Sequence, residues 1–378
     1  MLRGLSATII LLFVVNTLTA QSVEHQIVGR DTISYSYTPI DQSYTERGSG
    51  RFISKCLRGE PWSIVVLPIY TVETNFGMAL SAQYSKTKFD LSATAIASII
   101  GYYNISIEGN NTLHPRHNLS YGASTKSEPT RLWGLSFDSA LSNDYCTYTS
   151  RVHSGWVQYT WQATKHGRLG LSASYQHLGA RRLDTEAQAL LSGMPQTISS
   201  ASIGASYAYD SRSLTSNFEQ SGIHLNIGVK YRPQLLSNIG YDLWSATALF
   251  DYYSPLWRGA TLALDIYGEH NSQHTPWLLQ SHIGDNSHMR GYYPGQFRGN
   301  TMLSTQLELR QHIWRGIAIV AWGGAGSIFS KNDPFAWRKT LPTYGGGVRY
   351  YNKLLTVRAD IAFGRNSYNI ILGISEAF

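Results

Sequence analysis

Two arginine–glycine pairs, at 290–291 and 298–299, mark the stretch of this 378-residue chain that is best equipped for polar chemistry, GDNSHMRGYYPGQFRG (284–299). An arginine side chain is always charged, and its planar fork can bind a carboxylate through two hydrogen bonds. The density of glycine, with one proline, predicts a loop. A loop in solvent has no need of Tyr292 and Phe297, so the elements around it decide where it lies.

Four histidines lie in or beside the same loop, at positions 270, 274, 282 and 288, with Glu269 adjacent. A spacing of four residues suits a metal only where the backbone is helical or suitably folded. Polar loop residues near a surface are the simpler interpretation. We therefore expect no metal site and no cofactor.

The rest of the chain from Trp62 onward repeats one pattern, in which segments of 9–14 residues alternate apolar and polar side chains between short turn clusters. In GIHLNIGVKYR (222–232), for example, the Ile, Leu, Val and Tyr residues share one face. A period of two predicts β-strands, and no stretch shows a convincing helical period. The expected strands, about sixteen, lie near residues 75–86, 89–98, 101–109, 115–125, 131–138, 150–163, 167–177, 200–209, 220–231, 241–254, 258–270, 301–312, 315–328, 342–351, 354–364 and 367–378.

Short turns alternate with long loops along the chain, which is typical of an outer-membrane barrel. The polar faces of the strands carry ionisable groups that water must reach, and aromatic residues gather near strand ends, where membrane girdles lie. We therefore predict an all-β, transmembrane antiparallel β-barrel of about 16 strands; a secreted sandwich or solenoid is the alternative. Lumen-facing positions are Lys230, Arg232, Asp265 and Arg310.

The first twenty residues have the layout of a cleaved export signal: Arg3, an apolar run at 7–15 and a small residue, Ala20. That run is shorter than the roughly 20 residues of a membrane-spanning helix. We interpret residues 1–20 as a signal peptide, 21–61 as an arm or linker and 62–378 as the barrel.

The charge and the cysteine count limit the partners and the covalent chemistry of the chain. The net charge of +7 is spread without a Lys/Arg run, so we expect no nucleic-acid partner. Cys56 and Cys146 can pair in an oxidising compartment or remain separate thiols. No G-x-S-x-G signature is present. Inward-facing His224 and Ser206 lie on neighbouring predicted strands of unknown register, and we expect no enzyme.

Four segments resemble, in order, motifs of the BamA/TamA superfamily of outer-membrane assembly and translocation proteins, the bacterial surface antigen barrels. MRGYYPGQFRG resembles the family's V-R-G-F/Y loop motif followed by G-x-Y/F-R-G. The other segments are PIYTVETNFG (68–77), similar to the start of the family's barrel, YDSRS (209–213) followed by Gly222, and LELRQHI (307–313). The resemblance covers roughly residues 62–378.

The resemblance implies a sixteen-stranded barrel with this loop folded into the lumen and its arginine paired with carboxylates of the inner wall. Arg290, Gly291 and Tyr292 would form this latch, and alternation along 301–312 points Glu308 inward to receive Arg290. The family offers a second carboxylate on the following strand, where this chain has Gly324, so one carboxylate is expected.

Two more features concern the ends of the chain. Phe378 matches the family's aromatic assembly signal, although Glu376 stands where an apolar residue is usual. Residues 21–61 are too few for one of the family's POTRA domains, so we expect a short branch that lacks them.

The functional hypothesis is a bacterial outer-membrane barrel that inserts or translocates protein or lipid. It would act by opening the seam between its first and last strands, near 75–86 and 367–378. Expected partners are outer-membrane lipids and nascent outer-membrane or other envelope proteins. The alternatives are a passive channel, mildly anion-favouring through Lys230, Arg232 and Arg310, and a structural envelope partner.

Overall fold

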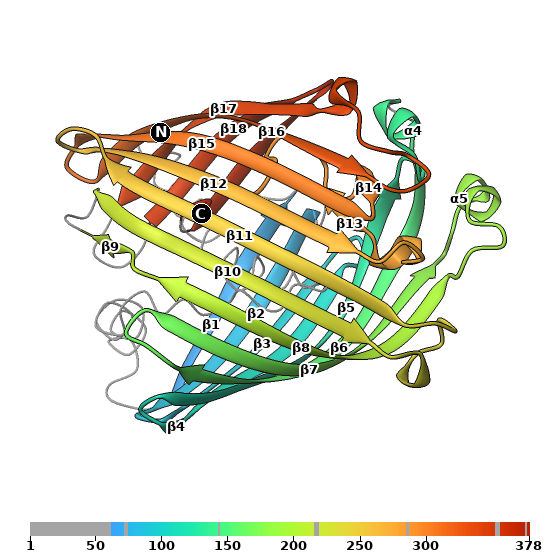
Figure 1. The fold of residues 1–378 in the computed structure, drawn as a ribbon, viewed down its shortest axis with the longest axis horizontal. Helices are drawn as coiled ribbons and strands as arrows, with labels where there is room; N and C mark the ends of the chain where they lie inside the picture. Colours follow the sequence, from blue (N-terminus) through green and yellow to red (C-terminus); the bar gives the residue numbers. More distant parts are fainter. Residues whose placement is uncertain are drawn as a thin grey trace, which may run out of the picture.

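The computed structural model describes residues 62–71, 75–142, 144–214, 219–284, 287–351, 356–374 and 376–378. One antiparallel sheet of 17 strands makes up most of it, and Figure 1 shows the strands wound around a common interior. The predicted signal peptide and arm, residues 1–61, lie outside the described residues, so both stay predictions.

The strands of the large sheet are β1 (Trp62–Thr71), β2 (Asn75–Lys86), β3 (Phe89–Ser98), β4 (Tyr103–His114), β5 (His117–Leu132), β6 (Cys146–Gln162), β7 (Gly167–Arg181), β8 (Thr197–Asp210), β9 (Ser213–Leu214), β10 (Gln220–Arg232), β11 (Leu243–Pro255), β12 (Ala260–Asn271), β15 (Thr301–Trp314), β16 (Ile317–Phe329), β17 (Leu341–Tyr351), β18 (Thr356–Gly364) and β19 (Ser367–Ile374). A separate two-stranded sheet joins β13 (Ser281–Ile283) to β14 (Phe297–Gly299). The helices are α4 (Phe137–Leu141), α5 (Thr185–Leu190) and the 3-10 turns η1 (Gln234–Leu236), η2 (Trp277–Leu279) and η3 (Trp337–Lys339).

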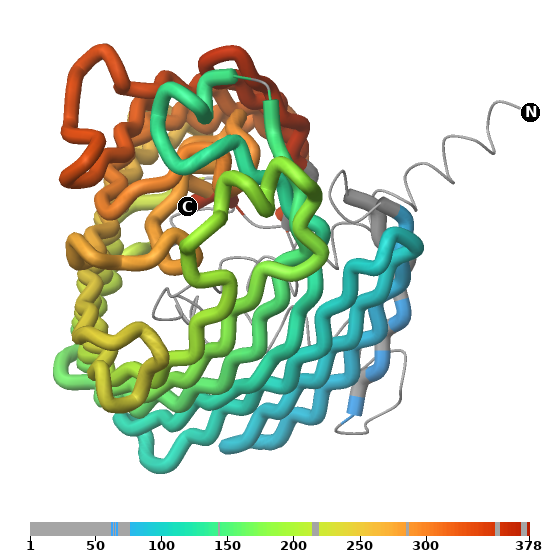
Figure 2. The backbone as a smooth tube through the Cα atoms, turned by 90° about the vertical axis from the view of Figure 1, so that its right-hand side faces the viewer, coloured from blue at the N-terminus to red at the C-terminus, as the bar shows by residue number. Residues whose placement is uncertain are grey.

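The strands pair in chain order from β1 to β19, with β8 next to β10 and β12 next to β15. Figure 2 shows the sheet curled into a ring, with the C-terminus inside it. Among the described residues, β1 pairs with β2 alone and β19 with β18 alone. These two strands are therefore the ends of the sheet, and we call the line between them the seam.

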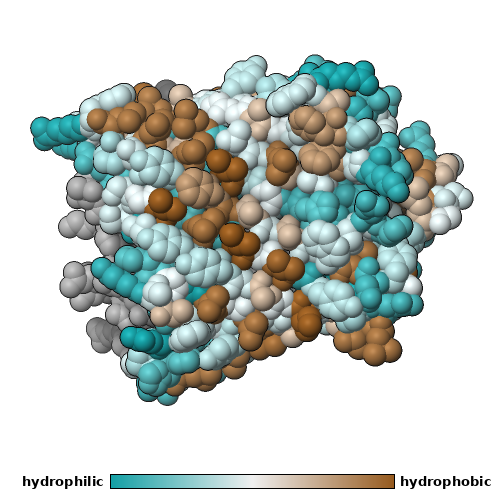
Figure 3. All heavy atoms as spheres, in the orientation of Figure 1, coloured by the Kyte–Doolittle hydropathy of each residue, from teal (hydrophilic) through white to brown (hydrophobic). Residues whose placement is uncertain are grey.

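The alternating side chains decide which face of the sheet lies outside. In β7, Leu169, Leu171 and Tyr175 are exposed, and Leu171 is 64% exposed. The serines between them point the other way, and Ser174 Oγ lies 2.8 Å from Ser202 Oγ on β8. Figure 3 shows apolar side chains spread over the outer wall. The apolar face is outward, so the predicted transmembrane β-barrel is confirmed.

Two strand predictions are wrong, and the two-residue β9, the seventeenth strand of the sheet, was not predicted either. The strand expected at 131–138 does not exist: β5 runs on to Leu132, and the chain then turns into α4. Ser136 and Ser139 cap that helix reciprocally. The first strand of the barrel is β1, which precedes the predicted first strand at 75–86. One seam strand is therefore β1 rather than β2.

The long loops all leave the same end of the barrel. They carry α4, α5 and the three 3-10 turns, and α4 and α5 rest on one or two buried side chains each. Neither of these described helices is long and apolar enough to cross a membrane. Beneath the loops lies a cluster of buried apolar residues that we call the cap core: Trp133, Phe137, Ala140, Leu249, Tyr267, Ile283, Met289, Tyr292, Phe297, Met302, Ile328 and Leu341.

Candidate functional site: an arginine network inside the barrel

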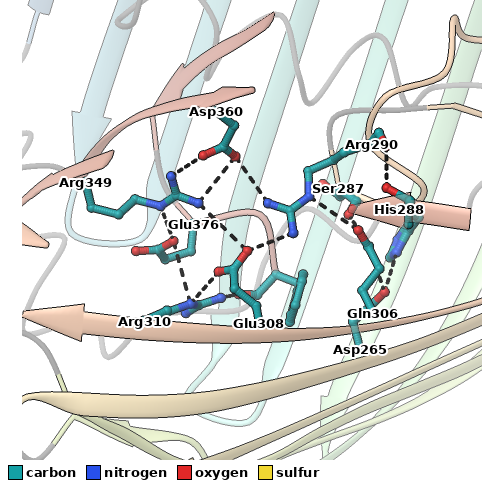
Figure 4. A network of polar contacts seen from close by, with 12 residues as sticks. Asp265, Ser287, His288, Arg290, Gln306, Glu308, Arg310, Arg349, Asp360 and Glu376 are labelled. Carbon is teal, nitrogen blue, oxygen red and sulfur yellow. Dashed lines mark hydrogen bonds and ion pairs between the residues drawn. The ribbon is translucent and has the colours of Figure 1, made fainter. Parts of the chain in front are cut away.

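Arg290 reaches the inner wall from the loop between β13 and β14 and is completely buried (Figure 4). Its Nη2 lies 2.7 Å from Glu308 Oε2, and its Nη1 lies 3.2 Å from Asp360 Oδ2. Its Nε donates to Gln306 Oε1 at 3.3 Å. The guanidinium also covers the ring of Trp322, 3.7 Å from the centroid. One side chain thus contacts strands β15, β16 and β18.

The second carboxylate around Arg290 is Asp360, and the expectation of a single carboxylate is wrong. At the position on β16 where the resemblance implies an acid, this chain has Gly324, and β18 supplies the second carboxylate instead. Arg358, Asp360 and Ala362 are all buried, which fits the inward face of an alternating strand. The fork of Arg290 therefore bridges two carboxylates on different strands, Glu308 and Asp360.

Two further arginines extend the contacts into a network. Arg310 Nε lies 2.7 Å from Glu308 Oε1. Arg349 pairs with Asp360, and its Nε lies 2.7 Å from Glu376 Oε2. Three arginines and three carboxylates thus alternate in space (Figure 4). Buried charges need partners because removal from water is costly, and the alternation gives every member at least one.

The last residues of the chain belong to this network. Glu376 accepts from the hydroxyl of Tyr351 and pairs with Arg349. Arg310 Nη2 donates to the carbonyl oxygen of Phe378 at 2.9 Å. These contacts explain why an acid stands at 376, where the resemblance led us to expect an apolar residue. An apolar side chain there would leave Arg349 with one carboxylate fewer.

Gly291 and Tyr292 fix the loop against β17 to β19. Gly291 has φ +104°, and a Cβ added there would lie 2.8 Å from the carbonyl carbon of Phe363. Tyr292 donates from its hydroxyl to the carbonyl of Pro342 at 2.6 Å and accepts from the Arg365 amide at 2.7 Å. Burial raises the pKa of Tyr292 to about 12, so its hydroxyl remains a donor.

A second anchor holds the same loop to β12. His288 Nδ1 lies 3.0 Å from Asp265 Oδ2, and the imidazole stacks on Tyr267 with centroids 4.3 Å apart. Gln306 Nε2 donates to the carbonyl of Ser287 at 2.7 Å. Asp265 is therefore one of the lumen-facing residues that contacts the loop, and its partner there is His288.

The other residues singled out in the sequence lie elsewhere on the wall. Lys230 and Arg232 are buried on β10, and Arg232 Nη1 donates to Ser245 Oγ at 3.3 Å. The register places Ser206 opposite Gly228 and not opposite His224. His224 Nδ1 instead lies 3.0 Å from Asp251 Oδ2.

The thiols and histidines give no metal or disulfide geometry among the residues that the structure describes. No group of three metal-ligating side chains gathers there. Cys146 is buried and donates to the carbonyl of Leu132 at 3.3 Å. Cys56 lies outside the described residues, so its pairing stays a prediction.

The chain resembles known proteins in its fold rather than in its sequence. No protein-family model and no curated protein matches the sequence. BamA from Haemophilus ducreyi lacking POTRA domains 1–3 matches with a TM-score of 0.60 at 12% identity, covering 81% of this chain and 67% of that chain. CdiB from Escherichia coli matches with a TM-score of 0.57 at 12% identity, covering 83% of this chain and 62% of that one. The chain thus spans roughly two thirds of each structure's length, and it has the fold of the BamA and CdiB barrels.

Proposed function

We propose that the protein is a bacterial outer-membrane barrel that inserts or translocates a protein or lipid client by opening at the seam, without enzymatic chemistry. The observation that carries this proposal is the Arg290 latch, defined as Arg290 with Glu308 and Asp360. It ties the loop to strands β15 and β18, close to the end of the sheet. Its partners would be outer-membrane lipids and nascent or resident envelope proteins.

The strands at the seam support opening there. β19 has 8 residues and β1 has 10, whereas β5 and β6 have 16 and 17. Short strands form fewer ladder hydrogen bonds, and an unpaired edge is a template for an incoming strand. The latch would hold the β15–β18 wall rigid while the seam moves.

The long loops argue against a steady passive channel. Gln296 Nε2 donates to the carbonyl of Ala140 at 3.0 Å, and the Phe137 amide donates to Asp333 Oδ2 at 3.1 Å. Phe137 and Phe297 also pack with ring centroids 5.3 Å apart. Loops from three hairpins therefore contact one another over the barrel mouth. A pore with this mouth would conduct only after the loops part.

A disulfide across the seam tests the proposal. In a background with Cys56→Ser and Cys146→Ser, Ile64→Cys or Val66→Cys would be combined with Tyr368→Cys or Ile370→Cys, all on exposed side chains. Each variant would complement a deletion strain, with outer-membrane proteomics and lipid analysis as readouts. The oxidised protein should fail to restore the deleted function, and reduction should recover it.

The matched control is Met78→Cys with Ala97→Cys, which are register partners on β2 and β3 away from the seam. Its disulfide should leave function intact. Full activity of the oxidised seam variants would refute opening at the seam. A deletion strain that loses only the uptake of one solute would favour the channel.

A further inference from the structure

A positively charged hollow lies at the rim of the barrel mouth, apart from the arginine network. It has a volume of about 190 Å³ and is lined by Phe137, Asp138 and Leu141 of α4, by Arg338 and Lys339 of η3, and by Arg365 of the β18–β19 turn. One water needs roughly 10–15 Å³ of such space, so a group of several heavy atoms fits. The three cations outnumber the one carboxylate that lines the hollow.

The cations differ in how far they are already paired. Lys339 forms an ion pair with Asp333. Arg338 and Arg365 form no ion pair with any carboxylate of the described chain, and Arg365 Nη1 donates to the carbonyl of Arg338 at 3.3 Å. That bond holds the two arginine-bearing segments together. Two guanidinium groups on adjoining segments suit the oxygens of a phosphate, which accept several charge-assisted hydrogen bonds.

A row of aromatic side chains on the outer wall indicates where the hollow lies relative to the membrane surface. Tyr344 on β17 stacks on Phe363 on β18 with centroids 5.6 Å apart, and Phe363 is the register partner of Tyr368 on β19. All three are exposed, Tyr368 by 74%. Aromatic rows of this kind mark the membrane–water interface. Arg365 follows Phe363 by two residues, so the hollow lies at the level of the lipid headgroups.

A further aromatic side chain lies beside the cations. Trp337, in η3 next to Arg338, is 83% exposed and packs edge-on against Phe335 with centroids 5.1 Å apart. An exposed tryptophan is costly in water and favourable at a headgroup layer. We propose that this hollow binds the phosphate of a membrane lipid headgroup through Arg338 and Arg365, with Trp337 against the lipid.

Native mass spectrometry of the full protein in dodecyl maltoside tests the site. Dioleoyl phosphatidic acid would be titrated against dioleoylglycerol, which has the same chains and no phosphate. Phosphatidic acid should be retained preferentially. The double variant Arg338→Gln with Arg365→Gln should weaken its retention by about tenfold or more, because two charge-assisted contacts are lost. Equal retention of the two lipids by the native protein would overturn the proposal.

Two further variants show whether a loss of lipid retention comes from the lost contacts or from misfolding. Arg116→Gln with Arg258→Gln removes two exposed arginines from the short turns at the opposite rim, and it should leave retention unchanged. Asp138→Asn removes the carboxylate from the hollow and should tighten retention. If the control pair weakens retention as much as the first pair, or if Asp138→Asn has no effect, the site assignment is wrong.

Inorganic phosphate separates the lipid from a free anion. Added at the same concentration as phosphatidic acid, it should not displace the lipid, because it lacks the chains that contact Trp337 and the outer wall. The Trp337→Ala variant should accordingly lose lipid retention while its binding of inorganic phosphate is unchanged. Displacement at equal concentration would show a site for free phosphate and would overturn the lipid assignment.

Discussion

Asp360 Oδ2 lies 3.2 Å from Arg290 Nη1, although the two residues are 70 positions apart in the chain. The contact joins the loop before β14 to the inward face of β18. Because the same guanidinium reaches Glu308 on β15, the loop is fixed to two strands that are not neighbours in the sheet. Arg290 is thus the anchor of the loop that carries two charged partners, beside the contacts of Tyr292 and His288.

Arg290→Gln should lower the free energy of unfolding by about 3 kcal/mol, because it leaves buried carboxylates with fewer partners. Arg310 and Arg349 still reach Glu308 and Asp360, which limits the loss. Urea unfolding in lipid vesicles measures it. A double-mutant cycle with Asp360→Asn should show coupling of about 0.5–3 kcal/mol. Additive effects would mean that the pair contributes nothing as a pair.

Gly291→Ala should destabilise the protein by about 1–3 kcal/mol, because an alanine is strained at φ +104° and its methyl would collide with the backbone at Phe363. Gly323→Ala on β16 is the matched control, since its added methyl meets nothing within 4 Å. The control should change stability by less than about 0.5 kcal/mol. Equal unfolding midpoints for the two variants would contradict the close approach of the loop.

Leu171→Lys should cost about 2–4 kcal/mol in lipid, because an outward side chain of β7 meets hydrocarbon. Ser172→Lys, on the inward face one residue later, should cost far less. Unfolding in vesicles compares the two variants. A larger effect for Ser172→Lys would reverse the assignment of the two faces, as would a native protein that remains monomeric without detergent.

Glu376→Gln should loosen the end of the chain, because the neutral amide loses its ion pairs with Arg349 and Arg310. Digestion by a carboxypeptidase in detergent measures the change, and the variant should lose Phe378 faster than the native protein. Tyr351→Phe, which removes one neutral partner of Glu376, should have a smaller effect. Identical digestion rates for all three proteins would show that the ion pairs do not hold the tail.

Asp184 makes the α5 loop sensitive to acid. Its carboxylate accepts from the Ala187 amide at 2.8 Å and from the Thr147 amide at 2.5 Å. These hydrogen bonds hold the pKa of Asp184 below its ordinary value of 3.8. The stabilisation is complete above that ordinary value and is lost as the pH falls through the lowered folded-state pKa.

Amide exchange at Ala187 should therefore accelerate, relative to the intrinsic rate, below about pH 4. Asp184→Asn can still accept from the Ala187 amide but carries no charge, so it should abolish this pH dependence. Protection of the Ala187 amide that stays constant down to pH 2 in the native protein would rule out the carboxylate as the cap.

Alternation of side chains predicted most of the sheet because lipid outside and polar groups inside impose a period of two on every strand. The prediction failed at 131–138. Trp133 and Phe137 have the spacing of alternating strand residues there, but both pack in the cap core. The signal for the helix was present as Ser136 and Ser139, three residues apart, which form the capping box.

The sequence predicted the contact of Arg290 with Glu308 but not the contact with Asp360. Glu308 was predictable because it lies on the strand that directly follows the loop. The alternation of side chains along that strand shows that Glu308 points inward. Asp360 also points inward by the alternation along β18. The distance between strands that are not neighbours cannot be read from the sequence, so its contact with Arg290 could not be predicted. Curvature of the sheet brings β18 opposite the loop, and curvature follows from the whole ring.

The inward turn of residues 376–378 makes them part of the inner wall. The Phe378 ring lies 5.4 Å from the Arg310 guanidinium carbon, on the inside of the wall. Arg310 Nη2 also donates to the main-chain oxygen of Phe378, and both Arg310 and Arg349 lie near the carboxylate of Glu376. The tail is therefore part of the charge balance of the inner wall, and its loss would leave two buried arginines with fewer partners.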